Sequence, residues 1–139
     1  MKKSYKLGAH KIALDLKTQL AKPNQCGIAH WESKSVEVRT TNASNGQPYE
    51  LPAMLVVFFH EFFHMIDLMQ GTDLFNDLDL ETDLIKETLL DSFCEGFVSF
   101  MLTNKLLTDK WVKDWENMLK KVKPLEIEKE TTNEGEREN

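Results

Sequence analysis

The segment VVFFHEFFHMID, from Val56 to Asp67, places two histidines four residues apart inside an apolar run. In a helix, residues at i and i+4 share one face, so His60 and His64 would lie one above the other. The residues around them are almost all bulky and uncharged, which predicts a buried helix. Two imidazoles and the carboxylate of Glu61 would be costly to bury without partners. The segment therefore predicts a core helix whose polar side chains meet a partner.

A metal ion is the partner that this spacing favours. Both imidazoles can reach one ion with nitrogen–metal distances near ~2.1 Å. Glu61 is one residue round the helix from His60, so it cannot easily bind the same ion, but it can reach a water bound to it. A hydrolytic zinc site needs this division between nitrogen ligands and a proton-accepting carboxylate. We therefore expect His60 and His64 to bind Zn²⁺ and Glu61 to be the catalytic general base.

The third ligand is expected from the segment IKETLLDSF, because catalytic zinc usually takes three protein ligands. Glu87 and Asp91 stand at i and i+4 there, and the 22 residues between His64 and Glu87 are enough to bring a second helix alongside the first. We assign Glu87 as the ligand and Asp91 as the acceptor of a hydrogen bond from the outer N–H of one histidine. Exchanged roles for these two residues are the main alternative, and Glu95 is the third choice.

The fold class follows from the order of the patterns. Alternating apolar residues in 10–16 and two short strands in 26–40, joined by a polar turn, predict a small N-terminal antiparallel β-sheet. A helix is expected from Leu51 to Gln70, with proline in its first turn and Gly71 as its stop. The result is an α+β domain in which the sheet is followed by the HExxH helix, a second ligand-bearing helix and a C-terminal helix.

The two later helices have weaker patterns. The second is expected over 81–104, after a polar, acidic connection over 72–83. Its apolar residues at helical spacing are Leu84, Leu89 or Leu90, Phe93, Phe97, Phe100 and Met101. Thr108 can cap the third helix, which is expected to run up to Pro124.

Length and charge limit the function classes. The 139 residues suit one domain, expected over 1–123, followed by an acidic, disordered tail over 124–139. The net charge is −6, of which −4 falls between Leu125 and Asn139. An acidic chain without a basic stripe argues against nucleic acid as a partner.

Targeting signals are not evident in the sequence. The chain has no run of eighteen uninterrupted apolar residues, which argues against a membrane span, and its start lacks the apolar region of a secretory signal. A cytoplasmic location is therefore expected, with Cys26 and Cys94 as reduced thiols. Cys94 is expected to be a buried small apolar residue.

The motifs resemble those of the gluzincin metallopeptidases. HEFFH fits their HExxH helix, and ETLLDSF fits the Glu-xxx-Asp arrangement of their second ligand helix. The small size and the order of elements are similar to compact phage or prophage proteins, minimal zincins like the ImmA/IrrE-type metallopeptidases. The likeness covers roughly Tyr5 to Asn104.

The resemblance implies a zinc-dependent endopeptidase, encoded by a phage or prophage and acting in the bacterial cytoplasm. The last strand before the motif helix, over 35–40, would bind a peptide substrate as an added strand. Glu61 would take the proton of the zinc-bound water and pass it to the leaving amine. His30 and Tyr49 are candidates for stabilising the oxyanion, although His30 also fits an ordinary surface residue.

Two other interpretations remain open. The chain could be a catalytically silent, zinc-stabilised binding or regulatory protein of phage origin. It could also be a structural helical domain without metal, in which the two histidines are ordinary residues.

Overall fold

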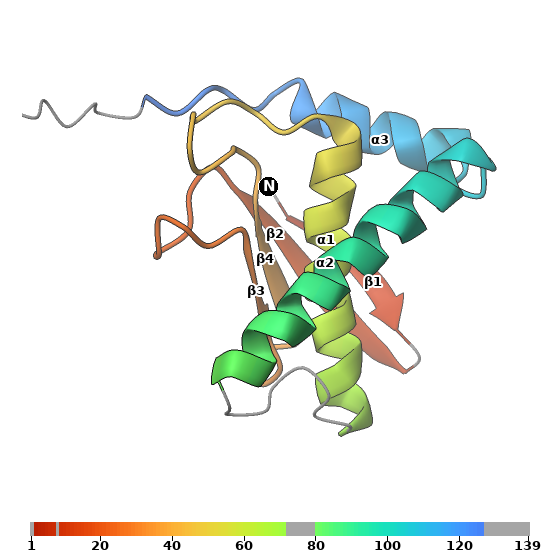
Figure 1. The fold of residues 1–139 in the computed structure, drawn as a ribbon. Helices are drawn as coiled ribbons and strands as arrows, with labels where there is room; N and C mark the ends of the chain where they lie inside the picture. Colours follow the sequence, from red (N-terminus) through yellow and green to blue (C-terminus); the bar gives the residue numbers. More distant parts are fainter. Residues whose placement is uncertain (1, 8, 72–79, 127–139) are drawn as a thin grey trace, which may run out of the picture.

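A computed structural model describes residues 2–7, 9–71 and 80–126 of the chain. Four strands precede three helices in this part of the chain (Figure 1), which confirms the predicted α+β class. The elements are β1 (Lys2–Leu7), β2 (His10–Lys17), β3 (Gly27–His30), β4 (Ser35–Arg39), α1 (Leu51–Gln70), α2 (Leu80–Thr103) and α3 (Asp109–Leu119).

The sheet is mixed, whereas an antiparallel sheet was predicted. Its order is β1-β2-β4-β3, and β2 pairs with β4 in parallel while the other two pairs are antiparallel. After β2 the chain forms β3 at the edge of the sheet. It then turns at residues 31–34, so that β4 lies between β2 and β3. β3 is consequently an edge strand, and β4 is hydrogen-bonded on both sides.

The core lies between the sheet and α1. Alternation along β2 turns Ile12, Leu14 and Leu16 to this side, and Val36 and Val38 of β4 join them. Phe58 of α1 contacts both Tyr5 of β1 and Trp115 of α3, at ring-centroid distances of 5.4 and 5.2 Å. This apolar contact fixes the height and rotation of α1 above the sheet.

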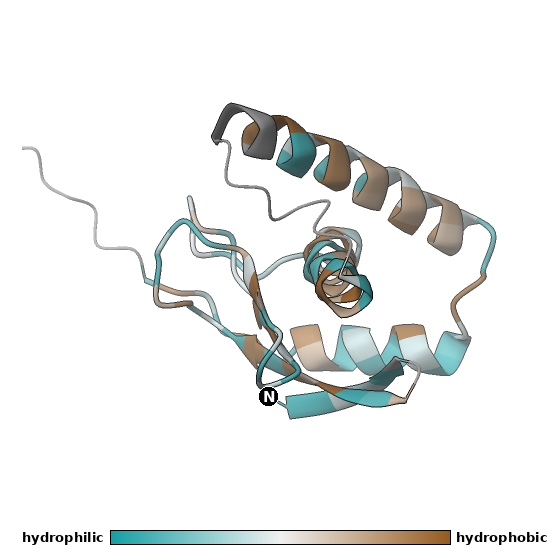
Figure 2. Cartoon of the chain, turned by 90° about the horizontal axis from the view of Figure 1, so that it is seen from below, coloured by the Kyte–Doolittle hydropathy of each residue, from teal (hydrophilic) through white to brown (hydrophobic). Residues whose placement is uncertain are grey.

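Helix α1 is the central element of the domain. Seen end-on in Figure 2, it has α2 on one side and the sheet with α3 on the other, and it contacts β3, β4, α2 and α3. Among the described helices, only α1 is long and apolar enough by length and composition to span a bilayer. Its neighbours on several sides and its buried Glu61 and Asp67 are, however, features of a core helix.

Helix α2 buries only part of the apolar set that its sequence suggested. Its inner side carries the buried Leu90, Cys94 and Val98, which confirms the expectation for Cys94. Much of the predicted apolar face is open to solvent instead; Leu84, Leu89, Phe93 and Phe100 are all more than half exposed. Glu87 and Asp91 of α2 also face α1, where they contact His60 and His64.

The third helix begins as predicted and ends earlier. The Thr108 side chain accepts a hydrogen bond from the backbone N–H of Trp111, which confirms the cap. The helix stops at Leu119, before Pro124, because the chain tightens into a turn in which Val122 N–H donates to Leu119 C=O. Leu125 then donates its N–H to the Gly46 carbonyl.

Two expectations from the sequence lie largely or wholly outside the described residues. The first is the acidic connection predicted over 72–83, of which residues 72–79 lie outside the described part. The second is the acidic tail predicted over 124–139, of which residues 127–139 lie outside it. The start of the predicted tail is held against the domain, since Leu125 is hydrogen-bonded to the loop before α1.

Candidate metal centre

Helix α1 sets the positions of both histidines. It begins at Leu51, with Pro52 in the first turn. Proline has no N–H, and the N–H groups of a first turn make no hydrogen bond within the helix, so none is lost. It ends as predicted at Gly71, whose φ of 62° is the left-handed conformation that favours glycine. Between these ends the helix is regular, so His60 and His64 lie on one face with ring centroids 4.8 Å apart.

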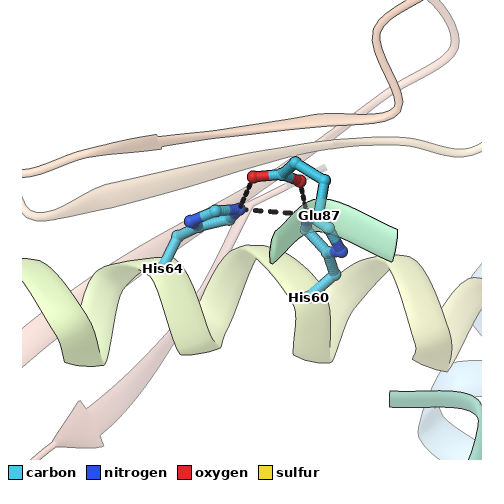
Figure 3. A group of neighbouring side chains, drawn as sticks. All are labelled: His60, His64 and Glu87. Carbon is cyan, nitrogen blue, oxygen red and sulfur yellow. Dashed lines mark hydrogen bonds and ion pairs between the residues drawn. The ribbon is translucent and has the colours of Figure 1, made fainter. Parts of the chain in front are cut away.

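The two imidazoles and Glu87 converge on a common point (Figure 3). The Nε2 atoms of His60 and His64 are 3.0 Å apart. The Glu87 carboxylate, which comes from α2, places Oε2 at 3.0 Å from the first Nε2 and Oε1 at 3.2 Å from the second. The histidine side chains are only 13% and 14% exposed, whereas that of Glu87 is 41% exposed.

These separations are close to those of a tetrahedral zinc site. Ligand atoms held at ~2.0–2.1 Å from one zinc ion in a tetrahedral arrangement lie about 3.3–3.4 Å from one another. The two Nε2 atoms, at 3.0 Å, are a few tenths of an ångström closer than this, and the separations of 3.0 and 3.2 Å to Glu87 end at different oxygens of its carboxylate. Small movements of the side chains would therefore bring His60, His64 and Glu87 to ligand distances, so the residues fit the ion.

Asp91 lies behind His60. Its Oδ1 is 2.7 Å from His60 Nδ1, and an ionised carboxylate can only accept a hydrogen bond. In a neutral ring this bond leaves the proton on Nδ1 and the lone pair on Nε2, which faces Glu87. Asp91 is therefore in the position expected for a group that orients a ligand, and Glu87 is in the position expected for the ligand itself.

The protonation of the cluster is compatible with a cation at its centre. Burial lowers the pKa of His64, against the raising effect of the neighbouring Glu87, so the neutral ring is favoured. A neutral imidazole is the form that binds a metal. If the His64 proton is on Nδ1, the lone pairs of both Nε2 atoms and of the carboxylate face one another at 3.0–3.2 Å, and a divalent ion would remove the resulting repulsion. If the proton is on Nε2, His64 donates a hydrogen bond to Glu87 instead.

Glu61 has a different environment from Glu87. It is 8% exposed, and it makes no hydrogen bond or ion pair with the residues that the structure describes. Burial raises its pKa to about 8, and the negative charges of Glu87 and Asp91 contribute. A nearby cation would oppose this shift. A buried carboxyl without a protein partner is suited to exchanging a proton with a molecule in the adjoining cavity.

A cavity of about 550 Å³ brings these groups together. One wall is formed by residues 24–29, which comprise most of β3 and the loop before it. The opposite walls come from α1 and α2, and they are lined by Val56, Val57, His60, Glu61, His64, Leu68, Glu87 and Asp91. The cavity is thus open to a ligand that lies between the edge of the sheet and the two helices.

The predicted substrate strand was wrong. The segment 35–40 contains β4, whose backbone groups pair with β2 on one side and β3 on the other, so it cannot accept an added strand. The edge strand beside the cavity is β3, and its residues Gly27, Ile28 and Ala29 line the cavity. This wall was not predicted from the sequence. A glycine within a strand was the available signal, because it often marks a close approach.

Neither of the two oxyanion candidates is among the residues that line the cavity. His30 is exposed at the end of β3. The Tyr49 hydroxyl is 3.7 Å from Cys26 Sγ, and burial together with this contact raises the pKa of Tyr49 to about 12. Neither side chain lines the cavity beside the histidines, so their placement gives no support to the oxyanion role.

Comparison with known proteins adds no family to this description: no family model, curated protein or solved structure matches the chain.

Proposed function

We propose that the chain is a zinc-dependent metallopeptidase that hydrolyses peptide bonds of a protein substrate. The observation that carries the proposal is the convergence of His60 Nε2, His64 Nε2 and the Glu87 carboxylate beside a buried Glu61 that has no hydrogen-bond or ion-pair partner among the described residues. Two imidazoles and one carboxylate form a ligand set of catalytic zinc, and a carboxylate beside it is the usual general base.

The ion and the chain divide the chemistry between them. Zn²⁺, when bound by His60, His64 and Glu87, would polarise the scissile carbonyl and make an attacking water more acidic. Glu61 accepts the proton of that water and returns it to the nitrogen of the leaving amine. A base that takes and returns a proton works best when its pKa is near the working pH, and burial moves the Glu61 pKa in that direction.

The edge of the sheet supports a peptide as the substrate. β3 has a free edge because β4 is its only partner among the described strands, and its residues 27–29 line the cavity. An extended peptide can add to such an edge through backbone hydrogen bonds. A peptide bound there would run past the histidines, with its backbone between β3 and the ligand cluster.

The test replaces Glu61 with its neutral isostere. Glu61→Gln should retain one equivalent of zinc, measured by elemental analysis, and lose cleavage of an unfolded, fluorescently labelled casein by 10²–10⁴-fold, a typical effect of a general base. If wild-type protein with bound zinc cleaves neither casein nor a broad peptide library, the zinc-stabilised binding protein replaces the enzyme. Lack of zinc in wild-type protein from metal-replete buffer would favour the metal-free structural domain.

A further inference from the structure

Gly27 is the first residue of β3, and its missing side chain makes room for Glu61. A Cβ atom placed on Gly27 would lie 2.2 Å from Glu61 Cγ and 2.5 Å from both Cδ and Oε1. Cβ contacts below 3.0 Å essentially never occur in proteins. The stem and carboxyl group of Glu61 therefore occupy the space that any other residue at position 27 would need.

The backbone of Gly27 does not explain the glycine. The glycines with positive φ among the described residues are Gly46 and Gly71, and Gly27 has an ordinary strand conformation. Glycine weakens a strand because it has no side chain to pack and a large backbone entropy in the unfolded chain. Its presence at the start of β3 therefore requires a packing reason, and Glu61 provides one.

Neither backbone can move away easily. β3 is fixed at this point because Gly27 pairs with Val38 in the sheet ladder and Arg39 N–H donates to the Cys26 carbonyl at 2.7 Å. On the other side, Glu61 belongs to the middle of α1, which is held by the buried Phe58 and Met65. A side chain at position 27 would thus displace the Glu61 side chain rather than the strand or the helix.

We propose that Gly27 is a positioning residue for Glu61: the bare backbone of the edge strand sets where the Glu61 carboxylate lies in the cavity. This inference rests on the proposed peptidase function for its kinetic consequence, but the steric relationship between the two residues does not. Gly27 also lies on the strand to which a peptide would add. One residue thereby sets the position of the general base relative to the strand that binds the substrate.

The kinetic experiment compares Gly27→Ala with Gly96→Ala in the full chain. Gly96 is an exposed glycine of α2, and a Cβ there would meet nothing within 4 Å, so it is a matched control. Gly27→Ala should lower kcat for casein cleavage by about 10–100-fold, with KM and zinc content close to wild type, because a displaced base affects proton transfer more than binding. Gly96→Ala should retain wild-type kcat. A wild-type kcat in Gly27→Ala would overturn the proposal.

Two further measurements do not depend on activity. In ¹³C-labelled protein, Gly27→Ala should shift the resonance of the Glu61 carboxyl carbon, which is identified by its disappearance in Glu61→Gln, while Gly96→Ala leaves it in place. In a double-mutant cycle, Gly27→Ala should change the melting temperature less in a Glu61→Ala background, where no Cγ remains to clash.

These measurements separate the two proposals. If no variant cleaves casein, a shifted resonance or a non-additive cycle still supports the steric role of Gly27, and only the peptidase function fails. An unshifted resonance together with an additive cycle overturns the role of Gly27, whether or not the wild type is an enzyme.

Discussion

His60 Nδ1 and Asp91 Oδ1 lie 2.7 Å apart and join α1 to α2 directly behind the convergent ligand cluster. The N–H of the His60 ring, whose side chain is 13% exposed, donates this bond to the carboxylate of Asp91, whose side chain is 61% exposed. It directs the Nε2 lone pair of His60 toward Glu87. The orientation of one imidazole thus depends on a residue that does not itself reach the point of convergence.

Replacement of Asp91 should weaken zinc binding without abolishing it. Asp91→Ala removes the hydrogen-bond acceptor of His60 Nδ1, so the ring loses its fixed orientation and tautomer. Partners of this kind contribute about 10–100-fold in metal affinity or activity. Competition with a zinc-binding dye measures the change. An affinity equal to that of wild type would mean that the His60–Asp91 bond does not orient the ligand.

Glu87→Ala should have a larger effect, because it removes a carboxylate that contacts both imidazoles. We expect a loss of zinc affinity well beyond that of Asp91→Ala, measured by the same competition. Glu95 provides the control on the same helix. It lines a different cavity, with Pro52, Ala53 and Val98, so Glu95→Ala should bind zinc like wild type. Equal losses of zinc affinity in Glu87→Ala and Glu95→Ala would contradict the placement of α2.

Zinc should also stabilise the fold. An ion that binds only the folded state at a hundred times its dissociation constant contributes about 2.7 kcal/mol. For a domain of this size, that corresponds to a rise of roughly 10 °C in melting temperature. His64→Ala should lose most of the rise, whereas His10→Ala should keep it, because His10 is on β2 and contacts Lys34. Differential scanning calorimetry with and without a chelator measures the rise in melting temperature of each variant. An equal rise in His64→Ala and His10→Ala would mean that the ion binds elsewhere.

Local signals were enough to predict the helices and the spacing within the candidate site. Pro52 and Gly71 bound α1, and Thr108 caps α3, because each acts through its own backbone or its immediate neighbours. The spacing of His60 and His64 fixes their common face in the same way. The placement of Glu87 beside them also agrees with the prediction, since two long helices joined by a short connection pack alongside each other.

Other features depend on contacts between distant segments. The alternation in β4 indicates a strand with a buried face, but not that β4 enters between β2 and β3. The apolar residues of α2 suggested a face that includes Phe93 and Phe100, but both are more than half exposed, and the pattern left Leu89 and Leu90 as alternatives, of which Leu90 is buried. A short-range pattern cannot choose between such faces, since α2 carries apolar residues on both.

The pH dependence of stability should reveal Glu61 in zinc-free protein. Its pKa rises from 4.5 to about 8 on folding, so the folded state favours the neutral carboxyl. The free energy of unfolding is therefore highest below the pKa that Glu61 has in the unfolded chain. This stability is lost as the pH rises through the pKa that Glu61 has in the folded protein. Wild-type protein in chelator should therefore lose stability between pH 5 and pH 8, by an amount on the order of a few kcal/mol.

Glu61→Gln isolates this effect from that of other groups. The lowered pKa of His64 acts in the opposite direction over part of the same range, so the difference between the two proteins is the informative quantity. The glutamine has no proton to lose, and the variant should gain stability relative to wild type as the pH rises from 5 to 8. Urea unfolding at several pH values in chelator measures this difference, and parallel curves for the two proteins would show that the Glu61 carboxyl is ionised and solvated. Added zinc should reduce the wild-type slope, because a cation beside Glu61 favours the carboxylate.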